Sequence, residues 1–289
     1  MINESKNIVW LASYPKSGNT WFRTFLSTIL DEEIKEPDIN DLYSTPIASA
    51  RGIFEEHTGL KSSEISTEET EALRPDVYRN LSSEIEDRMY MKVHDAFTKT
   101  KFNEWIFPPE VTFGVIYIVR NPLDVAVSFS NHNSQPVDKT IDNLCSHDFA
   151  LCRTKKSFPN QLLQKHLTWS EHAESWIKSP NKVCVLRYED MKLNSFKTFK
   201  KAVSFLALNK SDSEIKSAID ICSFENLRKQ EDEKSFSEKP QKCKNFFRKG
   251  KVGDWQKYLK KDHIDKIIKC NYDVMKKIGY LDDNDKIAF

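Results

Sequence analysis

The first 30 residues combine a short apolar run, a polar turn and an amphipathic pattern. Residues 8–13 (IVWLAS) are almost continuously apolar, which is typical of a strand buried on both faces within a parallel sheet. The turn YPKSGNT follows directly. Apolar side chains then recur at helical spacing, at Trp21, Phe22, Phe25, Leu26 and Ile29. A buried strand, a turn and a helix in this order predict an α/β fold.

Apolar runs of the same kind recur along the chain, at 89–93 (MYMKV), 115–119 (VIYIV) and 183–186 (VCVL). Residues 122–129 (PLDVAVSF) follow the second of these runs and open a helix with proline in its first turn. Further helices are predicted at 161–178, 195–207, 213–221 and 262–278. We predict a single domain over residues 1–289, with a central parallel sheet flanked by helices.

Three long segments are polar and rich in Ser, Asn, Lys or Pro: 35–80, 133–160 and 231–251. They are predicted to be loops or covers, and connections of that length are usually functional or disordered. We therefore expect a substrate-binding site among them. Three aromatic residues are candidates for such a pocket, with a place in the core as the alternative: Trp105, Phe149 and Phe158.

Composition excludes several classes of function. A formal net charge of +1 gives no chain-wide field for nucleic acid or a membrane surface. The six cysteines form no C-x-x-C pair and no zinc spacing, so they are interpreted as reduced, mostly structural thiols, and no metal is expected. The first apolar run has only six residues, too few for a signal-peptide core or a membrane span, which predicts a cytoplasmic location.

The turn after the first run has the composition of an anion site. Gly18 permits close approach to the backbone, and the N–H groups of residues 17–20 begin a helix whose dipole is positive there. A standard Walker A loop places its lysine after the last glycine, whereas Lys16 comes first here. The alternative is a plain helix cap, with Ser17 or Asn19 satisfying the end groups and Lys16 solvated. The turn alone leaves both interpretations open.

Five segments must be considered together with this turn. They are YPKSGNTW at 14–21, MKVHD at 91–95, YIVRNPLDVAVSF at 117–129, LRYEDM at 186–191 and FFRKGKVGDW at 246–255. In that order they resemble the cytosolic-type sulfotransferases, as a bacterial-like member of the family. Such enzymes use 3′-phosphoadenosine 5′-phosphosulfate (PAPS) as co-substrate and release adenosine 3′,5′-bisphosphate (PAP). The resemblance implies a P-loop-like phosphosulfate-binding loop after the first strand.

The resemblance assigns the 5′ end of the donor to this loop. Its backbone N–H groups would hold the phosphosulfate together with the lysine side chain, from Lys16, Ser17, Gly18, Asn19 and Thr20. Lys16 would lie close to the bridging oxygen, where a fixed cation stabilises the charge that grows in the transition state.

The resemblance also assigns the ribose 3′-phosphate and the adenine. Arg120 and Ser128 would bind the 3′-phosphate, and the late basic loop would close over it with Arg248, Lys249 and Gly250. The alternatives are an ion pair of Arg120 with Asp124 and a solvated basic turn. Three residues would contact the adenine: Trp21, Tyr188 and Phe224. Trp21 also lies on the apolar stripe of its helix, so a core position is its alternative.

His94 follows the second strand of the chain directly and is the candidate general base. The resemblance implies direct in-line transfer, in which His94 takes the acceptor proton while Lys16 and Lys92 stabilise the transferring group. The remaining histidines have no spacing that suggests metal binding and are interpreted as surface or loop residues: His57, His132, His147, His166, His172 and His263.

The acceptor is expected to be a hydroxyl or amine of a small molecule or glycan, and its identity is not readable from the segments that should shape it. Where the family often carries a dimer-forming threonine–valine pair, this chain has Lys260 and Lys261, which leaves the oligomeric state open. Two other functions remain as alternatives. One is a P-loop nucleotide or small-molecule kinase, and the other is a non-catalytic module that binds PAP.

Overall fold

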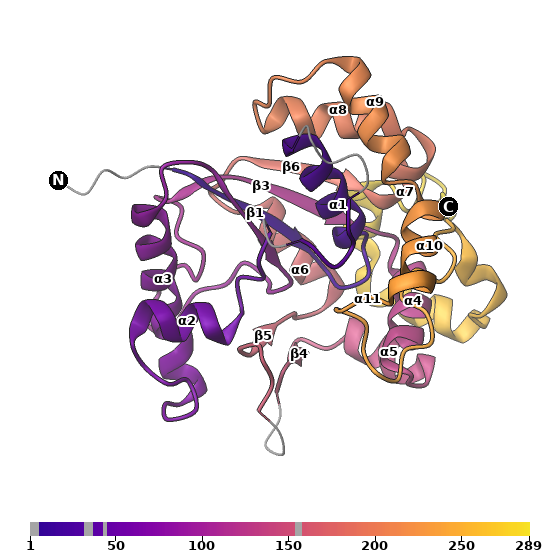
Figure 1. Cartoon of the computed structure of the whole chain (residues 1–289). Coiled ribbons are helices and arrows are strands. Elements are labelled where there is room, and N and C mark those ends of the chain that lie inside the picture. Colours follow the sequence, from indigo (N-terminus) through magenta and orange to yellow (C-terminus); the bar gives the residue numbers. More distant parts are fainter. Residues whose placement is uncertain (1–5, 32–36, 43–44, 154–157) are drawn as a thin grey trace.

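The computed structural model describes residues 6–31, 37–42, 45–153 and 158–289. A four-stranded parallel sheet lies at its centre, with the order β2-β1-β3-β6 (Figure 1). The strands are β1 (Ile8–Ser13), β2 (Met89–Val93), β3 (Thr112–Val119) and β6 (Val183–Arg187). All four predicted strands are confirmed, and so is the α/β class with its parallel sheet.

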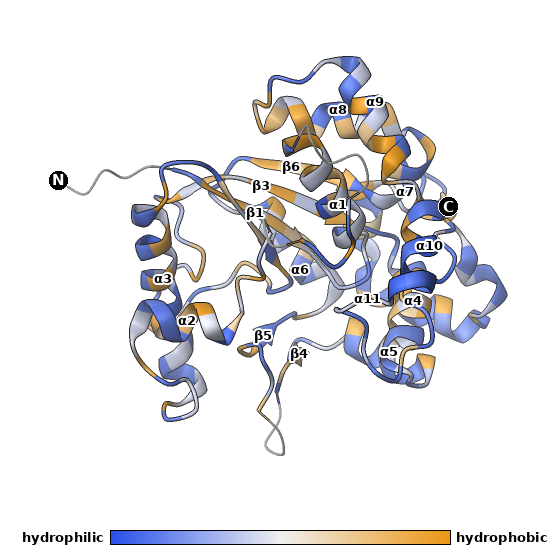
Figure 2. Ribbon diagram, in the orientation of Figure 1, coloured by the Kyte–Doolittle hydropathy of each residue, from blue (hydrophilic) through white to orange (hydrophobic). Residues whose placement is uncertain are grey.

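β1 is buried on both faces, as its continuous apolar run predicts. Val9 and Leu11 pack into one core cluster, whereas Ile8, Trp10 and Ala12 pack into another, and all five are fully buried. Figure 2 shows the apolar colouring of β3 and β6 against the mainly hydrophilic α10.

Helices cover both faces of the sheet (Figure 1). One core cluster joins the sheet to α1 (Asn19–Leu30), α8 (Ser195–Phe205) and α9 (Asp212–Ile221). The other joins it to α3 (Thr67–Glu84), α4 (Pro122–Asn133), α5 (Val137–Leu144), α6 (Trp169–Ile177) and α11 (Lys261–Ile278). The remaining elements are α2 (Arg51–Thr58), α7 (Tyr188–Leu193), α10 (Phe224–Lys234), the 3₁₀ turn η1 (Asp254–Lys257) and the ribbon of β4 (Ala150–Leu151) and β5 (Gln164–Lys165).

Two predictions about secondary structure are wrong. The segment 35–80 contains α2 and most of α3, and 133–160 contains α5. α3 has a weak apolar stripe interrupted by Pro75, yet Ser66 and Glu69 form a capping box that the spacing S-x-x-E shows. Residues 35–36, 43–44 and 154–157 of these segments lie outside the described residues.

The helix predicted at 161–178 begins only at Trp169. Gln164–Lys165 pairs with β4 instead, and Thr168 caps α6 together with Glu171. The capping box explains the late start, because it fixes the first turn of the helix after residue 168. Among the helices in the described part of the chain, none has the length and apolar character needed to cross a bilayer.

The parallel strands bring their carboxyl ends to one edge. The register aligns Ala12 of β1 with Val93 of β2 and with Tyr117 of β3, so the loops that follow these strands begin side by side. A buried ion pair braces this edge from α3. Arg74 Nη1 lies 2.6 Å from Asp95 Oδ1, and both side chains are only 3% exposed.

We expect Asp95→Ala to lower the free energy of unfolding by about 3–5 kcal/mol, because it leaves the buried Arg74 charge without a partner. Urea denaturation followed by circular dichroism measures this loss. Asp76→Ala is the control, since Asp76 is 63% exposed in its pair with Arg79 and should cost about 1 kcal/mol or less. Equal losses in the two variants would contradict a structural role for the Arg74–Asp95 pair.

Candidate active site at the carboxyl edge of the sheet

A cavity of about 660 Å³ opens where the carboxyl ends of the strands meet. Its size suits a small-molecule site. The walls include all but one of the predicted site residues: Lys16, Gly18, Asn19, Thr20, Trp21, Lys92, His94, Arg120, Ser128, Tyr188, Phe224, Arg248, Lys249 and Gly250. The exception is Ser17, which is fully buried behind the wall.

The turn after β1 takes a conformation that L-residues rarely adopt. The φ angles of Lys16 and Gly18 are +68° and +105°. A Cβ on Gly18 would lie 2.7 Å from Cδ2 of Tyr188, so glycine is required both for its φ angle and for this close approach.

The helix-cap alternative is wrong. Within the part of the chain that the structure describes, no side chain caps α1 and Ser17 Oγ is buried without a partner. Asn19 Nδ2 donates to Leu11 O at 2.9 Å instead. The first N–H groups of α1 therefore remain available to an anion.

Lys16 is held at this helix start without a carboxylate partner among the described residues. Its Nζ lies 3.2 Å from His132 Nδ1 and 3.6 Å above the centre of the Phe246 ring. Burial lowers the pKa of Lys16 to about 7, and the neighbouring cations Arg120 and Lys92 act in the same direction. An anion bound here would restore the full charge of this amine.

His94 has the tautomer that a general base requires. Its Nδ1 lies 2.9 Å from the backbone oxygen of Ser13, and a carbonyl oxygen only accepts, so Nδ1 carries the proton. Nε2 then keeps its lone pair on a side chain that borders the cavity. Burial, followed by the charge of Lys92, lowers the pKa of His94 well below its ordinary value. His94 is therefore neutral at neutral pH.

Arg120 joins the first loop to the late basic loop. It donates to Lys16 O at 3.3 Å and to Lys251 O at 3.1 Å, while its buried Nε has no partner among residues 6–31, 37–42, 45–153 and 158–289. The predicted alternative was an ion pair with Asp124, and Arg120 Nη2 approaches Asp124 Oδ2 only to 3.7 Å. Arg120 therefore keeps donor capacity at the cavity wall.

Asp124 anchors the late loop to α4. Its carboxylate oxygens accept from the backbone N–H groups of Gly253 at 2.9 Å and Trp255 at 3.0 Å. This carboxylate lies in the first turn of α4, where the helix dipole favours a negative charge.

The basic residues of this loop are paired rather than solvated. Arg248 Nη2 lies 2.5 Å from one Asp254 oxygen, and Lys249 Nζ lies 3.1 Å from the other. Gly250 has a φ angle of +60°, and a Cβ there would lie 2.4 Å from Cδ2 of Phe224. The loop therefore packs its backbone directly on the Phe224 ring.

Aromatic residues form one end of the cavity. Trp21 lies between the core and the cavity, because its ring is 5.5 Å from that of Phe199 and 6.0 Å from that of Tyr188. Lys192 Nζ lies 5.4 Å from the Trp21 ring and 5.5 Å from the Phe224 ring. The core alternative for Trp21 is thus confirmed, whereas its contact with adenine stays a prediction. Lys192 is a wall residue that the sequence analysis missed.

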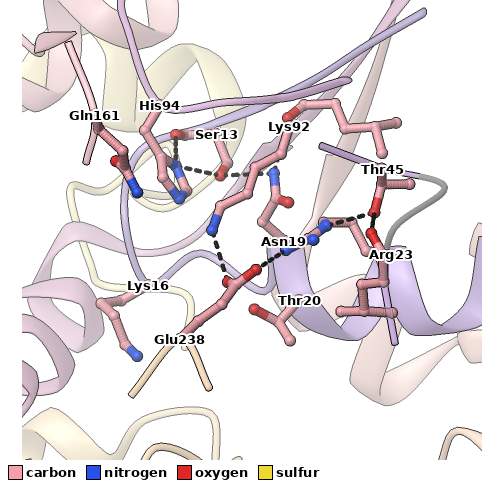
Figure 3. Close-up of polar contacts among 12 residues, drawn as sticks. Ser13, Lys16, Asn19, Thr20, Arg23, Thr45, Lys92, His94, Gln161 and Glu238 are labelled. Atoms are coloured by element: carbon pink, nitrogen blue, oxygen red, sulfur yellow. Dashed lines mark hydrogen bonds and ion pairs between the residues drawn. The ribbon is translucent and has the colours of Figure 1, made fainter. Parts of the chain in front are cut away.

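A carboxylate in the cavity was also missed. Glu238, which follows α10, accepts from Arg23 Nη1 and from Lys92 Nζ, each at 2.8 Å (Figure 3). Burial opposes ionisation, but Lys92 and Arg23 together lower the pKa of Glu238 to about 2. Arg23 was detectable from the sequence, because it is a charged residue on the buried side of α1. No sequence pattern indicates Glu238.

The interpretation of the other histidines as surface or loop residues is wrong for three of them. His166 and His172 are fully buried, and His132 borders the cavity, where burial followed by Lys16 lowers its pKa to about 3. The Tyr117 hydroxyl donates to His172 Nδ1 at 2.9 Å, and His172 Nε2 donates to the backbone oxygen of His94 at 3.1 Å.

The three aromatic candidates for the acceptor pocket do not border the cavity. Trp105 stacks on Phe97 and Phe149 packs beside Tyr14, both against the core, whereas Phe158 is 56% exposed. Within the described residues, no group of three or more His, Cys, Asp or Glu side chains is arranged to hold a metal ion.

The tautomer of His94 is directly testable. We expect nitrogen NMR of the imidazole to show a proton on Nδ1 and none on Nε2 at about pH 6, below the ordinary histidine pKa of ~6.5. His147, whose side chain is 78% exposed, serves as the internal reference. A His94 ring that becomes doubly protonated above pH ~6.5 would contradict the effect of burial.

The chain is similar in sequence to a known protein family. A family model described as "Sulfotransferase domain" matches residues 6–279. Cytosolic sulfotransferase 15 of Arabidopsis thaliana is 30% identical, across 91% of this chain and 70% of that protein. Flavonol 3-sulfotransferase of Flaveria bidentis is 25% identical, across 91% of this chain and 80% of that protein.

Solved structures share the fold. Mouse sulfotransferase SULT7A1 complexed with PAP superposes with a TM-score of 0.60 at 21% identity, covering 95% of this chain and 86% of the mouse chain. Retinol dehydratase in complex with androsterone and inactive cofactor PAP gives a TM-score of 0.59 at 21% identity, covering 94% of this chain and 81% of the other.

Proposed function

The chain belongs to the sulfotransferase family, and from this premise we propose that it transfers the sulfuryl group of PAPS to a hydroxyl or amine of a small molecule or glycan. One observation carries the proposal. A lysine at an uncapped helix start, an unprotonated histidine nitrogen and an arginine with an unpaired Nε all border one cavity, as Lys16, His94 and Arg120. The PAP complexes of two structural neighbours agree with a nucleotide of this kind.

The donor-binding residues follow from this geometry. The 5′ end would occupy the helix start, bound by Lys16 and by the N–H groups of residues 17–20. The 3′-phosphate would lie beside Arg120 and Ser128 beneath the loop of Arg248, Lys249 and Gly250. The adenine would lie between aromatic faces, contacting Trp21, Tyr188 and Phe224.

The ion pairs of the basic loop would then rearrange. Arg248 and Lys249 share one carboxylate, that of Asp254, so two cations face a single negative charge. A 3′-phosphate supplies the missing negative charge, and charge-assisted contacts of this kind are the strongest hydrogen bonds available.

The chemical step is a direct displacement at sulfur. The acceptor atom attacks the sulfur, the bond between sulfur and the bridging oxygen breaks, and that oxygen leaves on PAP with the electron pair. His94 Nε2 takes the proton of the acceptor. Lys16 and Lys92, whose amines are both buried, stabilise the negative charge on the bridging oxygen and the transferring group.

We expect His94→Ala to lower kcat by a factor on the order of 10² to 10⁴, which is the usual contribution of a general base, while PAP binding is retained. His147→Ala is the control, because the His147 side chain is 78% exposed and does not border the cavity. Steady-state assays with radiolabelled PAPS and calorimetry with PAP measure the two effects. Near-normal turnover of the His94 variant would refute the role of base.

The pKa of Lys16 predicts proton uptake on nucleotide binding. The free amine has a pKa of about 7 and becomes fully protonated beside the anion. The affinity for PAP should therefore be unaffected below this pKa and fall above it, by up to about tenfold per pH unit. Calorimetry at about pH 8 in two buffers of different ionisation enthalpy measures the protons taken up.

Lys16→Met is the matched control for that measurement, because it subtracts the protons that the nucleotide's own phosphates exchange. Equal proton numbers in the wild-type protein and in Lys16→Met would show that Lys16 does not titrate on binding. They would then assign the pH dependence to the nucleotide.

Two experiments separate the proposed function from its alternatives. In a thermal-shift assay without metal, PAP at 100 times its Kd should stabilise the protein by about 2.7 kcal/mol, whereas a kinase would respond to ATP with magnesium. Radiolabelled PAPS is then offered with a panel of phenols, alcohols, amines and sugars. Tight PAP binding with no transfer to any acceptor would indicate a binding module instead of an enzyme.

A further inference from the structure

The cavity has a second end, away from the aromatic faces, where polar side chains lie beside aliphatic ones. Here the side chains of Arg23, Lys92, Gln161, Gln164 and Glu238 border the same space as His94. The acceptor must reach His94 from this end, because the proposed donor would occupy the other end, between the first loop and the aromatic residues. The inference below rests on the proposed function.

Glu238 has hydrogen-bonding capacity to spare. A carboxylate has about four acceptor positions, and the two that Arg23 and Lys92 fill leave the rest open toward the cavity. Arg23 is only 3% exposed, and its Nε donates to Thr45 Oγ1 at 2.8 Å, so its guanidinium is fixed. When Lys92 binds the sulfuryl group during transfer, the ion pair with Arg23 still holds Glu238 in place.

A pair of glutamines provides complementary groups. Gln164 Nε2 donates to Gln161 Oε1 at 2.7 Å, which leaves Gln161 Nε2 as a donor and Gln164 Oε1 as an acceptor. Gln164 is 1% exposed, and its Oε1 has no partner among the described residues. Figure 3 shows the nitrogen of Gln161 turned toward the space beside His94. Gln164 Oε1 is itself enclosed, so the group that this pair presents to the cavity is the amide nitrogen of Gln161, a donor that a hydroxyl oxygen can accept from.

The described residues offer no open aromatic face at this end. Phe129 is 1% exposed, and the ring of Phe246 is covered by the Lys16 ammonium at 3.6 Å. The apolar part of the wall is mainly aliphatic, from Leu42, Ile47 and Leu151. A flat phenol would therefore lack a stacking surface and leave the polar groups unpaired.

We propose that the acceptor is a polyhydroxylated molecule of the sugar class, and that Glu238 is the residue that selects it. A sugar hydroxyl both donates and accepts, so neighbouring hydroxyls donate to Glu238 and accept from Gln161 while one of them faces His94. Sites built to bind a hydroxyl reject analogues that lack it by as much as about 10⁴-fold, because their buried polar groups stay unpaired.

The test uses pairs of acceptors that differ by one hydroxyl. Wild-type protein and Glu238→Gln receive radiolabelled PAPS with monosaccharides, disaccharides and their mono-deoxy analogues, beside p-nitrophenol and quercetin. We expect the wild-type protein to sulfate sugars with a kcat/KM at least about tenfold above that of the best deoxy analogue. In Glu238→Gln this ratio should fall toward one, while PAP affinity does not fall.

The matched control is Glu233→Gln, which alters an exposed carboxylate on α10 whose partner Lys229 lies 3.9 Å away. It should leave both the ratio and the affinity unchanged. A merely structural role of Glu238 would lower kcat/KM equally for a sugar and its deoxy analogue, and this result would overturn the proposal.

The remaining outcomes separate this inference from the proposed function. Transfer to phenols but not to sugars would sink the sugar class while leaving sulfuryl transfer intact. Transfer to no acceptor, with PAP binding retained, would overturn both. Loss of the PAP thermal shift in Glu238→Gln would show that Glu238 acts on the donor and not on the acceptor.

Discussion

The parallel pairing of β1 with β2 and β3 is the constraint on which the site depends. It sets the ends of three strands side by side, so that Lys16, His94 and Arg120 enter one space although they are far apart in the chain. Side chains alternate between the two faces of a strand, so a slip of one residue in β2 would turn His94 away from Ser13. The buried side chains of β2 oppose such a slip, because Met91 and Val93 pack into one core cluster and Tyr90 packs into the other.

The same edge concentrates positive charge. Lys16, Lys92, Arg23 and Arg120 border the cavity, and the carboxylates that border it among the described residues are Asp124, Glu238 and Asp254. Burial opposes the charge of Lys16 and Lys92 and lowers the pKa of each. A highly anionic nucleotide would relieve this repulsion, so the electrostatics favour a donor-bound state. The same anion would raise the pKa of the lysines that are proposed to act on it.

The strands and the donor side were predictable because their signals are local. A continuous apolar run identifies a buried strand, and residues directly after a strand lie at its carboxyl end, as His94 and Arg120 do. Helix α3 was missed because Pro75 and many charged residues weaken its apolar stripe, although its capping box was readable. The predicted start of helix α6 was too early, because the residues before Thr168 belong to the β4–β5 ribbon and to a loop.

The sequence by itself determined the α/β fold, the family and the donor-side motifs, because each of these depends on neighbouring residues. Only the tertiary structure decided what surrounds His94. Glu238 meets Lys92 across 146 positions of the chain, and Arg23 meets Glu238 across 215. No local pattern specifies such contacts, since they depend on how the loop after α10 packs over the sheet. The tautomer of His94 was decided in the same way, by the backbone oxygen of Ser13 on the adjacent strand.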